Sequence, residues 1–260
     1  MFLKSLEKAL KGIIFSPQTL IPLLVVVLVS FVSVQLTSWV LERPLTDIFL
    51  YYETMGQNNL LYLFLTQYPF EIATMIITGI IILFVTVVAL MSLAHFASGK
   101  KFIKAVNDAV MEWKKSLALT IVAIIIGFLL LVAFFVINFI FDLLYSLGIE
   151  ALNSFLALIL MPLIIVIIGI ILTIKFAFVL PAMIKEKPKK ALQKSWDFTN
   201  NKFWLSFVFV LVLGIIVFLL WSVIPYIGFL LGIDIIFDLI GEILAVTFFG
   251  LAISYYYIDN

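Results

Sequence analysis

Long apolar stretches alternate with short polar segments along the whole chain. Six of these stretches are long enough to cross a membrane, because a helix rises about 1.5 Å per residue and needs about 20 residues to span the hydrocarbon core. They are Leu20–Leu41, Ile72–Phe96, Leu117–Phe141, Phe155–Ile184, Phe203–Ile224 and Leu239–Ile258. The third and fourth exceed the necessary length, which predicts helices that tilt or extend beyond the bilayer. The pattern therefore predicts an all-α, polytopic membrane protein with six transmembrane helices.

Three of the polar segments share one pattern, and each stands before an apolar stretch. Lys4–Leu10, Lys104–Val110 and Lys190–Trp196 all read lysine, small, aliphatic, polar, charged, small, large apolar. On a helix their small and large apolar residues fall on one face, which is typical of an amphipathic helix at a membrane surface. The recurrence predicts one domain over residues 1–260, built from three parallel repeats of about 2–97, 101–184 and 188–258. Each repeat would be an interfacial helix followed by a helical hairpin.

The lysines lie on one side of the predicted spans. They occupy the N-terminal segment and the segments after the second and fourth spans, whereas the opposite side carries a single basic residue, Arg43. Basic residues are enriched in cytoplasmic connections, so both termini are expected in the cytoplasm of a multi-pass plasma-membrane protein. The long outer connection predicts two short interfacial helices, near Asp47–Tyr52 and Leu60–Leu65.

Composition narrows the class of protein further. The 260 residues are 65% hydrophobic and 12% charged, whereas an ordinary soluble domain has about 25% charged residues. The net charge of +1 predicts no nucleic-acid partner, and the lack of cysteine excludes a thiol nucleophile or a disulfide. We find no cofactor or metal motif and no nucleophile–base set, and we interpret the lone His95 as packing at the interface. These observations predict a protein that is not an enzyme.

Several residues are candidates for contact with lipid headgroups. Lys175 is the only basic residue within a predicted span, where its charge costs about 2.5–3.5 kcal/mol at a helix centre. It is either a counter-charge for a headgroup in an inward-facing groove or a lysine that snorkels to the interface. The inner-surface candidates are Lys104, Lys190, Lys194 and Trp196. They would recognise anionic lipid or a cytoplasmic partner, or the repeated helices would simply tie each hairpin to the bilayer.

Acidic and amide residues form two stripes near the opposite side. Asp234, Asp238 and Glu242 recur at four-residue spacing, as do Asn138, Asp142 and Ser146 at the end of the third span. Together they would line an outward-facing cavity that attracts cations; the alternative is ordinary charge at the start of a helix. Glu242 lies about a turn inside the hydrocarbon region, so we expect it to face inward, toward a hydrated pocket.

The third repeated segment carries a family resemblance. The residues involved are Lys175–Pro181, Glu186, Ala191–Trp196 and Lys202–Trp204. This order, from a basic residue in an apolar helix through a proline and an acidic residue to an Ala-Leu-x-x-Ser-Trp helix, resembles the membrane domain of some glycerophosphodiester phosphodiesterases. It also resembles related stand-alone multi-span membrane proteins of unknown function. The catalytic phosphodiesterase domain has no counterpart in this chain, so the resemblance implies a membrane module without hydrolase activity.

Three classes of function follow from these patterns. The favoured one is a non-enzymatic integral membrane protein that interacts with membrane lipids, anionic lipids included, or binds a protein partner, without a cofactor. The alternative is a small transporter or channel with an outward-facing acidic cavity, and a membrane enzyme acting on lipid ranks last. A polar path from Glu242 to Lys175 would favour transport, a lipid-sized lateral groove near Lys175 would favour lipid handling, and a sealed apolar bundle would favour a scaffold.

Overall fold

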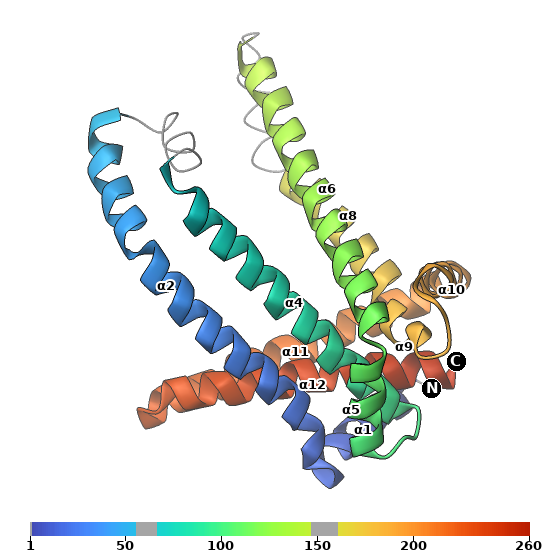
Figure 1. The fold of residues 1–260 in the computed structure, drawn as a ribbon. Helices are drawn as coiled ribbons and strands as arrows, with labels where there is room; N and C mark the ends of the chain where they lie inside the picture. The colour runs from blue at the N-terminus through green and yellow to red at the C-terminus, as the bar shows by residue number, and fades with distance from the viewer. Residues whose placement is uncertain (1, 56–66, 147–160) are drawn as a thin grey trace.

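A computed structural model describes residues 2–55, 67–146 and 161–260, and every regular element in these ranges is helical (Figure 1). The elements are α1 (Phe2–Phe15), the 3₁₀ helix η1 (Pro17–Leu20), α2 (Ile21–Met55), α4 (Pro69–Ala97), α5 (Phe102–Met111), α6 (Trp113–Ser146), α8 (Met161–Ala177), α9 (Val179–Met183), α10 (Pro188–Asn201), α11 (Phe203–Leu231) and α12 (Asp234–Asp259). The predicted all-α class is therefore confirmed for the described part of the chain.

In the described part of the chain, five helical segments are long and apolar enough to cross a membrane. They are Pro17–Leu41, Pro69–Ala97, Trp113–Val132, Phe203–Leu231 and Asp234–Asp259. They correspond to the first, second, third, fifth and sixth predicted spans, and they fit a multi-pass membrane protein.

The fourth predicted span has a different structure. Its described part is α8 followed by the short α9, and its apolar portion, Ile167–Met183, is shorter than the five spans. The helix is interrupted at Phe178 because Pro181 has no N–H to donate to the carbonyl of Ala177 four residues earlier. The start of this span, residues 155–160, lies outside the described residues, so a sixth span stays a prediction.

The outer connection also differs from the prediction. Residues 47–52 were expected to form a separate interfacial helix, but they continue α2 without a break. No glycine or proline lies between Pro44 and Gly56, so helix propensity is uninterrupted over residues 45–55. The second expected helix, residues 60–65, lies outside the described residues.

Both chain ends and the short helices α1, α5, α9 and α10 gather at one end of the molecule, which we call the basic end (Figure 1). Lys8 Nζ lies 2.8 Å from a carboxylate oxygen of Asp259, which joins α1 to the last turn of α12. The small residues of the three repeated segments are the buried ones in each helix: Ser5 and Ala9, Ala105 and Ala109, Ala191 and Ser195. Small side chains at four-residue spacing let a helix approach its neighbours closely. Threefold similarity of the complete repeats stays a prediction.

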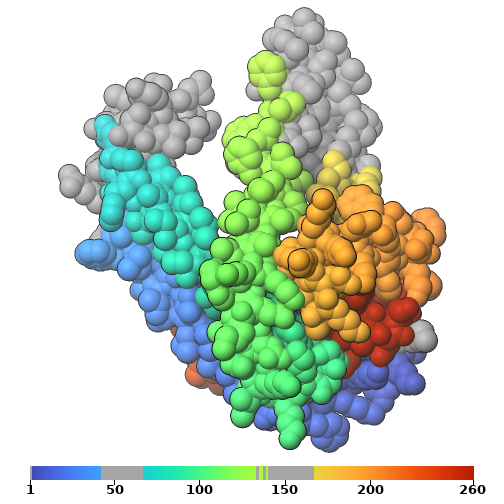
Figure 2. All heavy atoms as spheres, turned by 45° about the vertical axis from the view of Figure 1, so that its right-hand side comes forward, coloured from blue at the N-terminus to red at the C-terminus, as the bar shows by residue number. Residues whose placement is uncertain are grey.

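The second half of α12 is the centre of the basic end. Its buried residues include Phe248, Leu251 and Ala252, and a Cβ added at Gly250 would lie 3.0 Å from Cδ2 of Leu90 in α4. The α11–α12 hairpin runs across the α2–α4 hairpin rather than parallel to it (Figure 1). Away from the basic end α4 and α6 diverge, as Figure 2 also shows. Hydropathy predicts the length of such helices but carries no information about the angles at which they cross.

Candidate functional site

Lys175 lies in the last turn of α8 and is buried, with 6% of its surface exposed. Its ammonium donates a hydrogen bond to Oδ1 of Asn200 and lies 4.7 Å from the centre of the Trp196 ring. Both partners belong to α10. A buried ammonium is costly unless acceptors replace water, and an amide oxygen together with an aromatic face supplies them. Lys175 is thus held by protein groups, and its side chain does not extend into solvent.

A second contact fixes α10 to the end of α8. Ser195 Oγ donates a hydrogen bond of 2.5 Å to the backbone carbonyl of Lys175. The last four carbonyls of a helix have no partner within the helix, so the serine satisfies an acceptor that would otherwise be unpaired. Ser195, Ala191 and Thr199 form the buried face of α10. Leu192, Gln193, Trp196 and Asp197 lie on the adjacent side of α10.

That side of α10 closes a groove between α6, α8 and α10, which we call the lateral groove. It has a volume of about 390 Å³ and is open to the exterior. Its lining residues are Val122, Ile125, Ile126, Phe176, Leu192, Gln193, Trp196 and Asp197. The walls from α6 and α8 are apolar, whereas the exposed residues Gln193, Trp196 and Asp197 make a polar mouth. The helices that form it, α6 and α10, lie side by side on the face shown in Figure 2.

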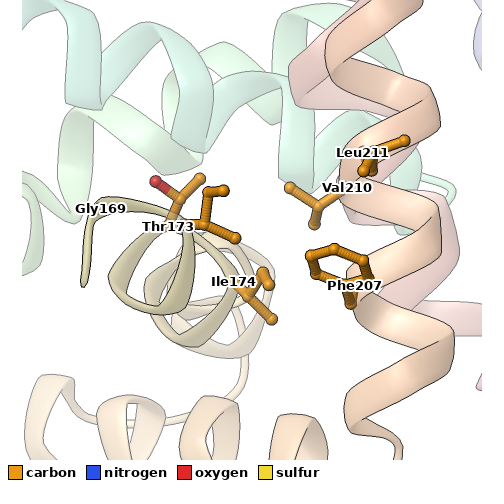
Figure 3. Close-up of a pocket in the computed structure, with 7 residues that line it drawn as sticks. Gly169, Thr173, Ile174, Phe207, Val210 and Leu211 are labelled. Carbon is orange, nitrogen blue, oxygen red and sulfur yellow. The ribbon is translucent and has the colours of Figure 1, made fainter. Parts of the chain in front are cut away.

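A second recess lies on the other side of α8, against α11. It has a volume of about 360 Å³, and Figure 3 shows residues of the two helices facing each other across it. The lining residues are Gly169, Ile170, Thr173, Ile174, Phe207, Val210 and Leu211. Only Thr173 contributes a polar side chain to this lining. Because it lacks a polar mouth, this recess offers room for an acyl chain but no group that would orient a headgroup.

A chain of polar contacts surrounds His95 at the basic end. His95 is fully buried, its Nε2 lies 3.3 Å from Glu112 Oε2, and Lys100 Nζ lies 3.1 Å from its Nδ1. Lys100 also donates a hydrogen bond of 2.6 Å to Asp108, which lowers the pKa of that carboxyl. Lys115 lies 3.1 Å from Glu112. These contacts join α4, α5 and α6, and each charged group in them has a partner of opposite sign or a ring nitrogen, as in a structural network.

The predicted inner-surface lysines differ in their surroundings. Lys104 and Lys190 are exposed, and Lys194 pairs with Glu186. The hydrogen bond between Lys194 and Glu186 lowers the pKa of the Glu186 carboxyl and raises the pKa of Lys194. Lys104 and Lys190 are accordingly available to a charged surface, whereas Lys194 is already engaged.

Three of the predicted outer residues, Asp234, Asp238 and Glu242, have described side chains, and none of them lines the lateral groove or the recess beside α11. All three are exposed, and the inward orientation expected for Glu242 stays a prediction. A Cβ added at Gly241 would lie 3.1 Å from Cδ of Pro225 in α11. Gly241 thus occupies the contact between the two helices, and the next residue points about 100° away from it. The side chains of Asn138 and Asp142, in α6, lie outside the described part of the structure.

Comparison with protein-family models, with curated proteins and with solved structures found no match. The function is therefore inferred from the geometry of this chain.

Three residues of the site were not expected from the sequence. Gln193, Asp197 and Asn200 share one face of α10 with Trp196, since the four positions follow the spacing i, i+3, i+4, i+7. That polar stripe was the available signal. The lysines of the same helix drew attention away from this stripe, because they indicated a positively charged surface.

Proposed function

We propose that this protein is a non-enzymatic integral membrane protein that binds a phospholipid in the lateral groove, at the cytoplasmic side of the plasma membrane. The observation that carries the proposal is the groove itself, which combines apolar walls from α6 and α8 with a polar mouth on α10, beside Lys175. Its volume of about 390 Å³ falls within the usual range of ligand pockets, about 300–1,000 Å³.

The polar mouth decides what such a groove can select. Within a bilayer an acyl chain is already in an apolar solvent, so moving it against Ile125, Ile126 and Phe176 gains packing but little hydrophobic free energy. Polar contacts to the headgroup carry the selectivity instead. Trp196 suits this position because tryptophan prefers the boundary between hydrocarbon and headgroups.

The exposed lysines support the proposed orientation. Lys104 and Lys190 lie at the basic end, where each basic residue near an anionic leaflet contributes about 1 kcal/mol of attraction. This attraction would hold α5 and α10 at the membrane surface and would place the mouth of the groove at headgroup level. The resemblance described above, to a membrane module without hydrolase activity, agrees with this role.

Transport is not favoured by the described residues. Glu242 is exposed on α12, whereas Lys175 is buried against α10. No hydrogen bond or ion pair among the described residues joins Glu242 to Lys175, whose partners are Asn200 and Trp196.

Retention of lipid by the purified protein tests the proposal. We expect native mass spectrometry to show bound phospholipid after a delipidating detergent wash. Ile125→Trp fills the groove and should lower its occupancy by about tenfold, equivalent to about 1.4 kcal/mol. Ile121→Trp is the matched control, because Ile121 is similarly exposed one turn earlier on α6 and does not line the groove. Equal retention by both variants and the parent protein would contradict binding in this groove.

A further inference from the structure

The charge at the mouth of the lateral groove has an unexpected sign. Among the described residues that line it, Asp197 is the only charged one, although α10 is rich in lysine. Asp197 is exposed, and the described residues provide it with no ion pair. Two neighbouring lysines already have other partners: Lys194 pairs with Glu186, and Lys175 is buried against Asn200.

We propose that the lateral groove selects zwitterionic phospholipids whose headgroup carries a primary ammonium, in preference to anionic phospholipids. This inference rests on the proposed lipid-binding function and adds the class of ligand to it. The exposed lysines and the groove then have different roles. The lysines attract the anionic membrane surface as a whole, and the groove selects an individual lipid.

The arrangement of α10 side chains matches an ammonium group. Gln193 and Asp197 are one helical turn apart and both line the mouth, with Trp196 between them. An ammonium has three donors and no acceptor. The carboxylate of Asp197 accepts a charge-assisted hydrogen bond, and the amide oxygen of Gln193 accepts a second. The exposed part of Trp196 supplies an apolar surface for the methylene groups of the headgroup.

The phosphate of the same lipid has a partner on the same helix face. Lys189 is exposed and lies one turn before Gln193, about 12 Å along the helix axis from Asp197. The long side chain of lysine covers part of this distance. The face of α10 thus presents a positive group at one end and a negative group at the other. A zwitterion satisfies both groups, whereas an anionic headgroup leaves Asp197 unpaired beside a like charge.

Competition between two lipids with identical acyl chains tests the inference. The protein is reconstituted in nanodiscs with equimolar phosphatidylethanolamine and phosphatidylglycerol, and the lipids it retains are counted by native mass spectrometry. We expect phosphatidylethanolamine to be retained about fivefold more, the ratio that one exposed ion pair of about 1 kcal/mol can produce. Asp197→Asn should bring the ratio close to one, and Asp197→Lys should reverse it.

Two variants serve as controls. Lys189→Gln should lower retention of both lipids equally and keep their ratio, because both carry a phosphate. Asp238→Asn removes an exposed carboxylate from α12, away from the groove, and should change nothing. Because Asp197 is exposed, its variants should keep the parent melting temperature, which circular dichroism checks.

The outcomes separate this inference from the proposed function. If the parent protein retains lipid but prefers phosphatidylglycerol or neither lipid, or if Asp197→Asn keeps the parent ratio, the inference is overturned and lipid binding stands. If no lipid is retained, the proposed function fails. Soluble phosphoethanolamine is also added as a competitor, and it should not displace the bound lipid, because it has no acyl chains to occupy the apolar walls. Displacement by it would overturn a lipid ligand in favour of a free amine.

Discussion

At the scale of single residues, Lys175 shows how a largely apolar chain holds a buried cation. Its ammonium donates a hydrogen bond to Asn200 and contacts the Trp196 ring, and its backbone carbonyl accepts a hydrogen bond from Ser195. All three partners come from α10, so Lys175 is one of the residues that hold that short helix against α8. The position of α10 in turn sets the width of the lateral groove.

We expect Asn200→Ala to destabilise the protein by about 1.5–3 kcal/mol, the contribution of a hydrogen bond to a charged group. The substitution leaves a buried ammonium without its amide acceptor. In a Lys175→Met background the same change should cost far less, because no charge remains to be satisfied. Thermal unfolding in one detergent measures both costs, with the exposed Lys190→Ala as control. Equal costs in the two backgrounds would show that the two side chains are not coupled.

At the scale of elements, the α11–α12 turn depends on a glycine. A Cβ added at Gly228 would lie only 2.3 Å from Cβ of Phe237, so the two helices meet there at backbone distance. We expect Gly228→Ala to separate them and to destabilise the protein by about 1–3 kcal/mol. Gly214 lies in the same helix with nothing within 4 Å of an added Cβ. Gly214→Ala should therefore stabilise the protein by about 0.5–1 kcal/mol. Melting temperatures that move in the same direction for both variants would contradict the close contact.

The elements differ in how far the sequence predicts them. Runs of apolar residues are a local property, and they identified the five helices that are long enough to span a membrane. The interruption at Phe178 is also local, because Pro181 causes it. The lateral groove depends on residues far apart in the chain, because Ile125 and Trp196 come to line it only after α6, α8 and α10 have packed. No spacing within the chain predicts that arrangement: the polar stripe on α10 includes Asp197 but does not show what lies opposite it.

At the scale of the whole molecule, the basic end sets the expected orientation in the membrane. The chain has no cysteine, so single cysteines can be introduced and labelled with a membrane-impermeant reagent. Lys101→Cys, in the exposed segment before α5, should react only after the cells are permeabilised. Ile235→Cys, 74% exposed near the start of α12, should react in intact cells. Labelling of Lys101→Cys in intact cells would reverse the proposed orientation.

The ion pair between Lys8 and Asp259 holds the first and last helices of the chain together, so the two chain ends lie close to each other. Because the first and last helices already touch, a linker of a few residues between the two ends would close the chain into a ring without moving α1 or α12. New ends could then be opened in the turn between α11 and α12, and the same helices would follow one another in a different order. Which hairpin is synthesised first is, on this view, independent of how the hairpins pack. The lateral groove would form in such a permuted chain as well, because α6, α8 and α10 keep their connections.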